Sequence, residues 1–401
     1  MTEWKTYRLG DICDYGTSRT ANIENYISTE NMLPNKGGVY TSSNVPSGVA
    51  VEYKVGDILI SNIRPYFQKI WQADCKGACS ADVLCIRANN KADSKYLYYL
   101  LSQQLFFDYV MSGAKGCKMP RGDKKQIMQW DISLPPIDVQ RQITGVLSAI
   151  DNKIALNTRI NDNLEQQAQA LYKQWFVDFE FPNEEGKPYK SFGGKMADSE
   201  LGPIPEGWRV QTISDISVRI ASGGTPKSLN ESYYNGEIKW FTTKELKDCF
   251  LIDSDKHIST EALNDSAAKL FPKNTILMAI YAAPTVGRLG ILTAESTFNQ
   301  AAVGIVAKEE IGHLFVYLTL LAERENLNNL ASGAAQQNLN VGIVKQYKLI
   351  VPTKKLLIEF NQIAGSLFER IKVVSNENKT LATLRDSLLP KLMNGEIKVS
   401  E

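Results

Sequence analysis

The stretch between Pro136 and Pro182 places the strongest constraint on the fold, because its apolar residues repeat at a spacing typical of paired helices. No proline interrupts it, and Asp138 occupies the position of a helix N-cap. One long helix is predicted. Its seam positions alternate at intervals of four and three residues: Ile143, Leu147, Ile150, Ile154, Asn157, Asn161, Leu164, Ala168, Leu171 and Trp175. The seam asparagines are predicted to fix the register; a long helix on an ordinary core, with wet asparagines, is the alternative.

A second seam follows Pro352 and is predicted to pair with the first. Its members are Ala364, Leu367, Ile371, Val374, Asn378, Leu381, Arg385, Leu388 and Leu392. If the two helices run antiparallel, Asn161 and Asn378 meet near the middle of the pair. Pro390 is predicted to kink or end the last turn, and Gly395 to stop the helix.

The rest of the chain reads as two copies of one pattern. Matching segments lie roughly 200 to 220 residues apart: 9–12 and 213–216, 56–60 and 274–278, 80–86 and 299–305, 96–111 and 316–331, 112–114 and 332–334, 134–135 and 351–352, and 142–143 and 362–363. Short strands precede a helical hairpin in each copy, so the predicted class is α+β. The predicted division is a first domain (1–135), a central helix (136–181), a linker (182–206), a second domain (207–352) and a C-terminal helix (353–401).

Length and composition indicate a soluble globular protein. The chain has 401 residues, of which 43% are apolar and 22% charged, enough for two or three domains. Residues 1–5 do not open a signal peptide, and the most apolar runs, 275–283 and 311–322, are too short to cross a bilayer. We therefore predict a cytoplasmic protein with no membrane partner.

No motif for catalysis or metal binding was found. Lys227-Ser228 lacks the preceding glycine of a phosphate-binding loop, and no metalloprotease, serine-hydrolase or adenine-methyltransferase signature occurs. Cys75, Cys79 and Cys85 have no second cysteine pair with metal-ligand spacing, and the chain has 2 histidines. We predict reduced thiols, no metal, no catalytic residue and no cofactor bound by this chain. An unrecognised hydrolase is a poorly supported alternative.

Charge argues against a protein that is basic overall, since the net charge is +1. Any DNA contact must come from local patches. One such patch lies within residues 112–130, where Lys115, Lys118, Arg121, Lys124 and Lys125 face a single acid, Asp123. A solvated loop is an equally good interpretation of that patch taken alone.

Polar and aromatic side chains recur at matching loops of both copies, and they are of the kinds that contact bases and phosphates. The candidates in the first copy are Arg19, Ser42, Ser43, Asn44, Asn62, Arg64, Tyr66, Lys115, Lys118 and Arg121. Those in the second copy are Lys227, Tyr233, Tyr234, Thr242, Thr243, Lys244, Arg288, Gln336, Gln337 and Asn338. Taken singly, each is more often a turn or surface residue than a contact, so the hypothesis depends on their recurrence.

Two similar domains on antiparallel helices acquire an approximate two-fold axis, and duplex DNA offers a matching two-fold with half-sites about 34 Å apart. Such a chain could read a bipartite and, after divergence of the copies, asymmetric site. A coiled-coil scaffold that assembles protein partners without reading DNA would have the same geometry and is the alternative.

Several short motifs, in this order along the whole chain, resemble the specificity subunit of type I restriction-modification systems. They are Leu134-Pro135-Pro136 with Gln140-Arg141-Gln142-Ile143, Gln174-Trp175-Phe176-Val177-Asp178-Phe179, Gly202-Pro203-Ile204-Pro205-Glu206-Gly207-Trp208, Ser222-Gly223-Gly224-Thr225-Pro226, Asn299-Gln300, and Ser332-Gly333-Ala334 with Asn338-Leu339-Asn340. The first copy departs from this pattern, because residues 16–19 stand where the second copy has 222–226.

The resemblance implies two target-recognition domains that each read half of a split site in double-stranded DNA. In this family the two seams also serve as docking sites for two copies of a modification subunit, which binds S-adenosylmethionine and methylates adenine. A restriction subunit, the endonuclease and translocase, joins them to cleave. Because recognition domains vary within the family, the resemblance identifies no base contact.

Overall fold

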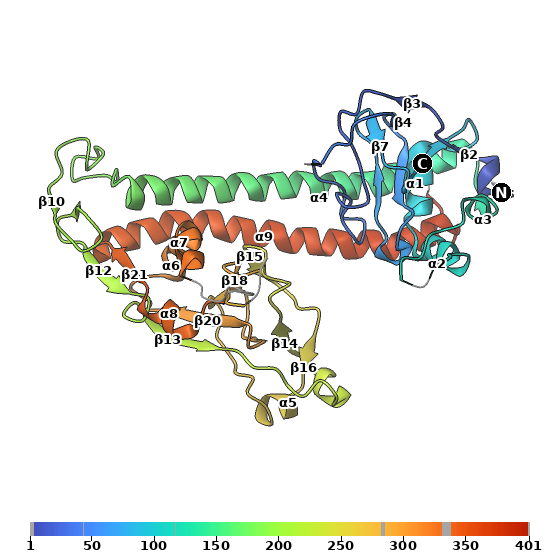
Figure 1. Ribbon diagram of the computed structural model, residues 1–401. Coiled ribbons are helices and arrows are strands. Elements are labelled where there is room, and N and C mark those ends of the chain that lie inside the picture. Colours follow the sequence, from blue (N-terminus) through green and yellow to red (C-terminus); the bar gives the residue numbers. More distant parts are fainter. Residues whose placement is uncertain (1–3, 43, 117, 282–284, 331–337, 400–401) are drawn as a thin grey trace. The chain divides into compact units, whose positions relative to one another are not determined.

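The computed structural model describes residues 4–42, 44–116, 118–281, 285–330 and 338–399 (Figure 1). The chain divides into two compact units. Unit 1 consists of Met1–Ala155 with Lys379–Glu401, and unit 2 consists of Leu156–Asn378. The long helices α4 (Ile137–Tyr172) and α9 (Lys354–Met393) therefore each contribute to both units. The predicted division into consecutive ranges stays a prediction, since compactness groups the chain differently.

Unit 1 is built on an antiparallel sheet whose central strands are mostly buried. Its strand order is β2 (Cys13–Tyr15), β8 (Val83–Ala88), β5 (Ile58–Ser61) and β6 (Ile70–Gln72). The unit also contains β3 (Arg19–Thr20), β4 (Ala50–Tyr53) and β7 (Gly77–Cys79) in a second sheet, the pair β1 (Lys5–Arg8) and β9 (Asp131–Leu134), and helices α1 (Ser94–Leu101), α2 (Gln104–Ser112) and α3 (Lys124–Ile127). The predicted helical hairpin is thus two short helices, α1 and α2.

Unit 2 repeats this plan with additions. Its larger sheet has the order β13 (Ser217–Ser222), β20 (Ala302–Ala307), β17 (Ile276–Ala279), β18 (Leu289–Leu292) and β15 (Cys249–Leu251). A smaller sheet contains β16 (His257–Ile258), β14 (Ile238–Phe241) and β19 (Thr297–Phe298). Two strand pairs join β10 (Met196–Ala197) to β11 (Ile204–Pro205) and β12 (Arg209–Thr212) to β21 (Lys348–Val351). The helices are α5 (Thr260–Asn264), α6 (His313–Ala322), α7 (Arg324–Asn329) and α8 (Val341–Gln346). The α+β class is confirmed.

Hydrogen bonds confirm the internal repeat residue by residue. In each unit an aspartate oxygen accepts the backbone N–H three residues earlier: Asp11 from Arg8 at 2.8 Å, and Asp215 from Thr212 at 2.9 Å. Two further pairs of backbone bonds match: Leu9 N to Trp130 O with Ile213 N to Tyr347 O, and Asn89 N to Ile12 O with Lys308 N to Ile216 O. The copies differ in the smaller sheet, where β4 pairs antiparallel with β7 but β14 pairs parallel with β19.

The two long helices pack together in each unit. In unit 1, Ile143 and Leu147 share a core with Leu389 and Leu392. In unit 2, Ala168, Leu171 and Trp175 share a core with Ala364, Leu367 and Ile371. All the predicted seam positions are buried or half-buried. The predicted pairing of the seams is confirmed.

Polar contacts set the register of that pairing. In unit 2, the Asn157 amide donates to Glu377 at 2.8 Å and the Asn161 amide donates to Ser375 at 3.0 Å. From Asn157 to Asn161 the residue numbers rise on α4, while those of their partners on α9 fall from Glu377 to Ser375. The helices are therefore antiparallel. Asn378 was predicted to be the partner of Asn161. That prediction was wrong, because the Asn161 amide donates to the Ser375 hydroxyl.

Three details of the helices differ from the sequence predictions. Helix α4 begins at Ile137, so Asp138 lies in its first turn and not at the N-cap. Helix α9 continues through Pro390 to Met393, so the proline does not end the helix, and the predicted kink stays a prediction. The alignment of Ile143 with Ile363 was wrong: Ile143 is 1% exposed and Ile363 is 43% exposed, whereas Phe360 is fully buried. Phe360 is therefore the equivalent of Ile143.

The segment predicted as a linker is packed against aromatic rings at its ends. The Phe181 ring stacks on Tyr189 at 4.5 Å and on Trp208 at 5.2 Å. Just before it, a π-helical turn, Lys173–Val177, follows α4 and buries Trp175 and Phe176. No helix in the described part of the chain is long and apolar enough to span a bilayer.

A half-buried acid on α4 should make the stability of unit 2 depend on pH. Burial, with smaller contributions from the carboxylates of Asp162 and Asp248, raises the pKa of Glu165 to about 7. The folded state therefore binds more protons than the unfolded state between pH 4.5 and about 7, so the free energy of unfolding falls as pH rises through that range.

We expect Glu165→Gln to remove this contribution. At pH 8 the variant should be more stable than the parent by about 1 kcal/mol, after allowance for solvent screening. Thermal unfolding of both proteins between pH 5 and 8 would show the difference growing with pH. Glu369→Gln, at an exposed position of α9, is the control, and a difference that does not change with pH would contradict the assignment.

Candidate nucleic-acid interface

Three loops of unit 1 meet at the ends of its central strands. They are the segment after β5, the turn before β8 and the loop after α2. The Asn62 N–H donates to the Asp82 carbonyl at 2.8 Å, the Gly122 N–H donates to the Asn62 carbonyl at 3.3 Å, and the Arg64 N–H donates to the Pro120 carbonyl at 2.8 Å. The fold thus joins the predicted polar segment to the predicted basic loop. We call this place the three-loop junction.

Unit 2 contains the same junction. The Ile280 N–H donates to the Ala301 carbonyl at 2.9 Å, and the Leu339 N–H donates to the Ile280 carbonyl at 2.9 Å. Ile280, Ala301 and Leu339 therefore correspond to Asn62, Asp82 and Gly122. Two candidates of the second copy lie here: Asn338 precedes Leu339, and the Arg288 carbonyl accepts from the Ala279 N–H at the end of β17. Candidates Ser43, Gln336 and Gln337 lie outside the described residues.

Ion pairs neutralise part of the basic loop in unit 1. Lys115 lies 3.1 Å from Asp123, and Arg121 lies 3.1 Å from Asp82. The hydrogen bond from Lys115, followed by those from backbone N–H groups, lowers the pKa of Asp123. Lys118 is exposed to solvent. All four paired side chains are at least partly exposed, so phosphate could displace either carboxylate at little cost.

Two side chains at this junction contain buried polar atoms that lack partners. Among the described residues, the Asn62 Oδ1 accepts no hydrogen bond and the Arg64 Nε donates none. In unit 2, the Oδ1 of Asn299, beside the same junction, is also buried and accepts no hydrogen bond from a described residue. Unsatisfied buried polar atoms are uncommon in folded proteins and often occur at functional sites.

The other candidates of unit 1 lie at three different places. Ser42 donates to the Asn44 carbonyl at 3.0 Å and lines a pocket of about 1020 Å³ together with Tyr26, Tyr40 and Trp71. Arg19, on β3, lines a neighbouring pocket of about 150 Å³ that also includes Tyr26. Tyr66 is exposed on the turn that follows Arg64.

The aromatic candidates of unit 2 support its smaller sheet. The Tyr233 hydroxyl donates to Asp265 at 3.1 Å and the Tyr234 hydroxyl donates to the Pro226 carbonyl at 2.9 Å. The Thr242 hydroxyl donates to Glu245 at 2.9 Å. These groups therefore already have partners within the unit. Thr243 is half-buried, whereas Lys227 and Lys244 are exposed.

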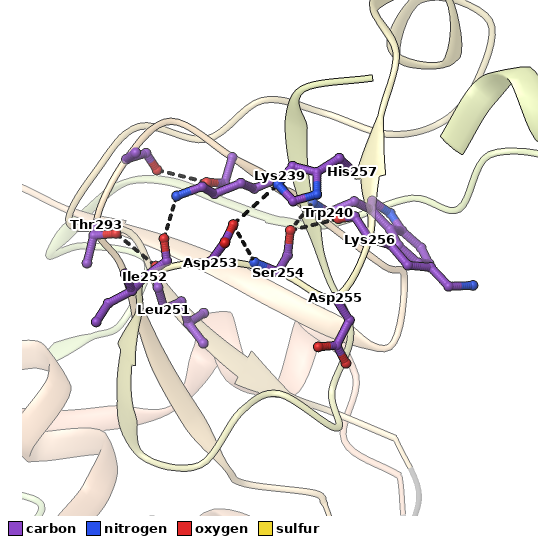
Figure 2. Close-up of polar contacts among 12 residues, drawn as sticks. Lys239, Trp240, Leu251, Ile252, Asp253, Ser254, Asp255, Lys256, His257 and Thr293 are labelled. Carbon is purple, nitrogen blue, oxygen red and sulfur yellow. Dashed lines mark hydrogen bonds and ion pairs between the residues drawn. The ribbon is translucent and has the colours of Figure 1, made fainter. Parts of the chain in front are cut away.

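Asp253, Lys256 and His257, on strand β16 or just before it, are further polar groups of this sheet that the sequence did not reveal (Figure 2). His257 Nε2 lies 3.3 Å from the Asp253 carboxylate, and the Lys239 ammonium donates to the Ile252 carbonyl. The Lys256 ammonium lies 5.3 Å from the Tyr234 ring centre. Lys256 and His257 also line a pocket of about 500 Å³. A strand of two residues has no readable periodicity, so no sequence signal marked it.

Metal chemistry finds no support in the described residues. No group of three or more His, Cys, Asp or Glu side chains there is placed to hold a metal ion. Cys75, Cys79 and Cys85 are free thiols, and burial raises the pKa of Cys79 to about 12. Such thiols stay protonated at neutral pH and are poor nucleophiles.

Comparison with known proteins gives one consistent family. The family model described as "Type I restriction modification DNA specificity domain" matches residues 1–166 and 205–382. The HindI specificity subunit of Haemophilus influenzae is 28% identical over 463 aligned residues, which cover 99% of this chain and 100% of that protein. The MjaIX specificity subunit of Methanocaldococcus jannaschii is 29% identical and covers 77% of this chain and 70% of its own length.

A solved structure agrees at the level of the fold. The type I restriction-modification S subunit from M. genitalium superimposes with a TM-score of 0.58 at 15% identity, covering 98% of this chain and 96% of that one. Because the family model matches most of the chain in two ranges, one in each copy of the repeat, this chain belongs to the family of type I restriction-modification DNA specificity subunits.

Proposed function

We propose that the chain is a non-catalytic subunit that reads a bipartite, asymmetric site in double-stranded DNA, with one recognition domain for each half. The observation that carries this proposal is the three-loop junction, which recurs in both units with matching hydrogen bonds. Divergence of the surrounding loops, such as the parallel pairing of β14 in place of the antiparallel pairing of β4, accounts for two different half-sites.

The proposed partners follow from the same assignment. We propose that α4 and α9 dock two copies of a modification subunit, that this subunit binds S-adenosylmethionine and performs the methylation, and that a restriction subunit joins the complex. The division into recognition domains 1–135 and 207–352, with helices 136–181 and 353–401 and a linker at 182–206, is part of the proposal, as is a location in the cytoplasm. A near-neutral chain suits this role because its partners would share the contacts with DNA phosphates.

DNA binding by the assembled complex tests the proposal. The chain with its modification subunit should prefer its bipartite site over a scrambled duplex, and its affinity should fall about 10³-fold between 50 and 200 mM salt. Arg64→Ala and Lys244→Ala should each lower the salt slope by about 1. Lys187→Ala, which removes a surface partner of Glu185, is the control.

The scaffold alternative predicts a different result. A pure scaffold would bind DNA equally well after Arg64→Ala or Lys244→Ala, whereas Leu147→Asp, at a buried seam position, would abolish assembly. Affinity that is independent of salt and of sequence would exclude the DNA-reading role.

A further inference from the structure

The turn between β5 and β6 has a backbone that side chains normally avoid. Arg64 has φ 51° and Gln68 has φ 50°, both in the left-handed region, and they flank a single 3-10 turn, Pro65–Phe67. Left-handed residues with a side chain are disfavoured and persist only where the surroundings enforce them. We call the segment 64–68 the aromatic turn.

Hydrogen bonds to two other segments fix the aromatic turn in place. The Arg64 N–H donates to the Pro120 carbonyl at 2.8 Å, and the Phe67 carbonyl accepts from the Asn35 N–H at 2.8 Å. The Gln68 carbonyl accepts from the Lys36 N–H at 2.9 Å. The strain is therefore held by the neighbouring loops, and a ligand would meet a preformed shape at little cost in conformational entropy.

The turn holds two aromatic rings toward solvent. Tyr66 is 48% exposed and Phe67 is 37% exposed, and their ring centres are 4.7 Å apart. Met119, which directly precedes Pro120, is 53% exposed as well. Pro65 fills the core side of the turn. The rings therefore contribute little to the core, and the strained turn serves to present them.

Cationic groups surround this apolar tip. The Arg64 guanidinium has no ion-pair partner among the described residues, and its Nε is buried without a hydrogen bond. The Lys69 ammonium lies 6.0 Å from the Phe67 ring centre, and Lys118 precedes Met119. An apolar tip flanked by cations is complementary to stacked bases between two phosphate backbones.

We propose that the aromatic turn is a wedge that unstacks one base step of the DNA half-site, with Arg64 holding an adjacent phosphate. Inserted apolar side chains are a known way for proteins to kink duplex DNA. The wedge would give unit 1 a specificity that does not require base hydrogen bonds, because base steps differ in the cost of unstacking. This inference rests on the proposed DNA-reading function and assigns a mode of contact to one site within it.

The test uses the assembled complex with the modification subunit and a duplex carrying 2-aminopurine at successive positions of its target site. Binding of the parent complex should raise the fluorescence at one step of one half-site, because the probe becomes unstacked there. The double variant Tyr66→Ala with Phe67→Ala should lose that rise and bind roughly 10- to 100-fold more weakly, the range expected when base stacking on aromatic rings is lost. Phe192→Ala, at a 59% exposed aromatic residue elsewhere, should change neither.

Each other outcome is decisive. Unchanged fluorescence and affinity in the double variant would overturn the wedge and leave the proposed function standing. Loss of assembly with the modification subunit would also overturn it, since the turn would then be a protein contact. Absence of any site preference in the parent complex would overturn the proposed function itself. A melting temperature equal to that of the parent would show that the variant is folded.

Discussion

Replacing Phe360 by alanine is expected to lower the free energy of unfolding of unit 2 by about 3–5 kcal/mol. The side chain is fully buried on α9, and its ring centre lies 4.7 Å from that of Phe176 and 6.0 Å from that of Trp175. Alanine would remove the ring from the point where α9, the π-helical turn and the core of unit 2 meet. The cavity left there is enclosed by large aromatic groups that cannot easily collapse into it.

Urea unfolding followed by tryptophan fluorescence measures this loss, because Trp175 lies beside the substituted position. Ile363→Ala is the matched control on the same helix; its side chain is 43% exposed, so the change should be within about 0.5 kcal/mol. Equal effects of the two substitutions would contradict the placement of Phe360, and not Ile363, in the core of unit 2.

The second large effect is expected from Arg87→Met in unit 1. Arg87 donates to both carboxylate oxygens of Asp57, at 2.7 and 2.6 Å, and Asp57 is buried. Removing the guanidinium would leave a buried carboxylate with no opposite charge, which costs about 3–5 kcal/mol. The measurement is the free energy of unfolding of the full chain in a chemical denaturant.

Unit 2 itself provides the control for this prediction. The strand registers Ile58 with Ile86 and Ile276 with Ile305 make Thr275 the equivalent of Asp57, and Val306 the equivalent of Arg87. The double variant Asp57→Thr with Arg87→Val should therefore recover most of the stability that Arg87→Met loses, because replacing both members of a buried ion pair is often nearly neutral. Additive losses from the two positions would contradict this account.

Periodic features were predictable from the sequence, because they depend on local spacing alone. The seams on α4 and α9 and the strand segments follow from residues within one turn or strand of each other, and the repeat follows from matching such short segments along the chain. The alignment of Ile143 with Ile363 failed because it matched identical letters, whereas the fold places Phe360 by its burial. The partner of Asn161 failed for another reason: the register of two antiparallel helices depends on how the intervening domain packs, and no local signal records that.

The candidate site was predictable in its parts but not in its assembly. Arg64 and Arg121 were both identified as polar loop residues, yet only a tertiary contact, the antiparallel bridge between Ile63 and Arg121, brings their loops together. The aromatic turn was identified only through Arg64 and Tyr66, since its left-handed backbone has no glycine to mark it. Several hydroxyl candidates, such as those of Tyr233 and Thr242, have internal partners that depend on tertiary contacts.

Unit 1 is not made from residues 1–155 alone, because residues 379–401 also belong to it. Leu389, Leu392 and Met393 belong to the same core as Ile143 and Leu147. During synthesis, helix α9 must therefore leave the ribosome before the N-terminal unit can complete its interior. A stop codon ahead of Leu389 would therefore leave the core of unit 1 open, although most of that unit is synthesised more than 200 residues earlier.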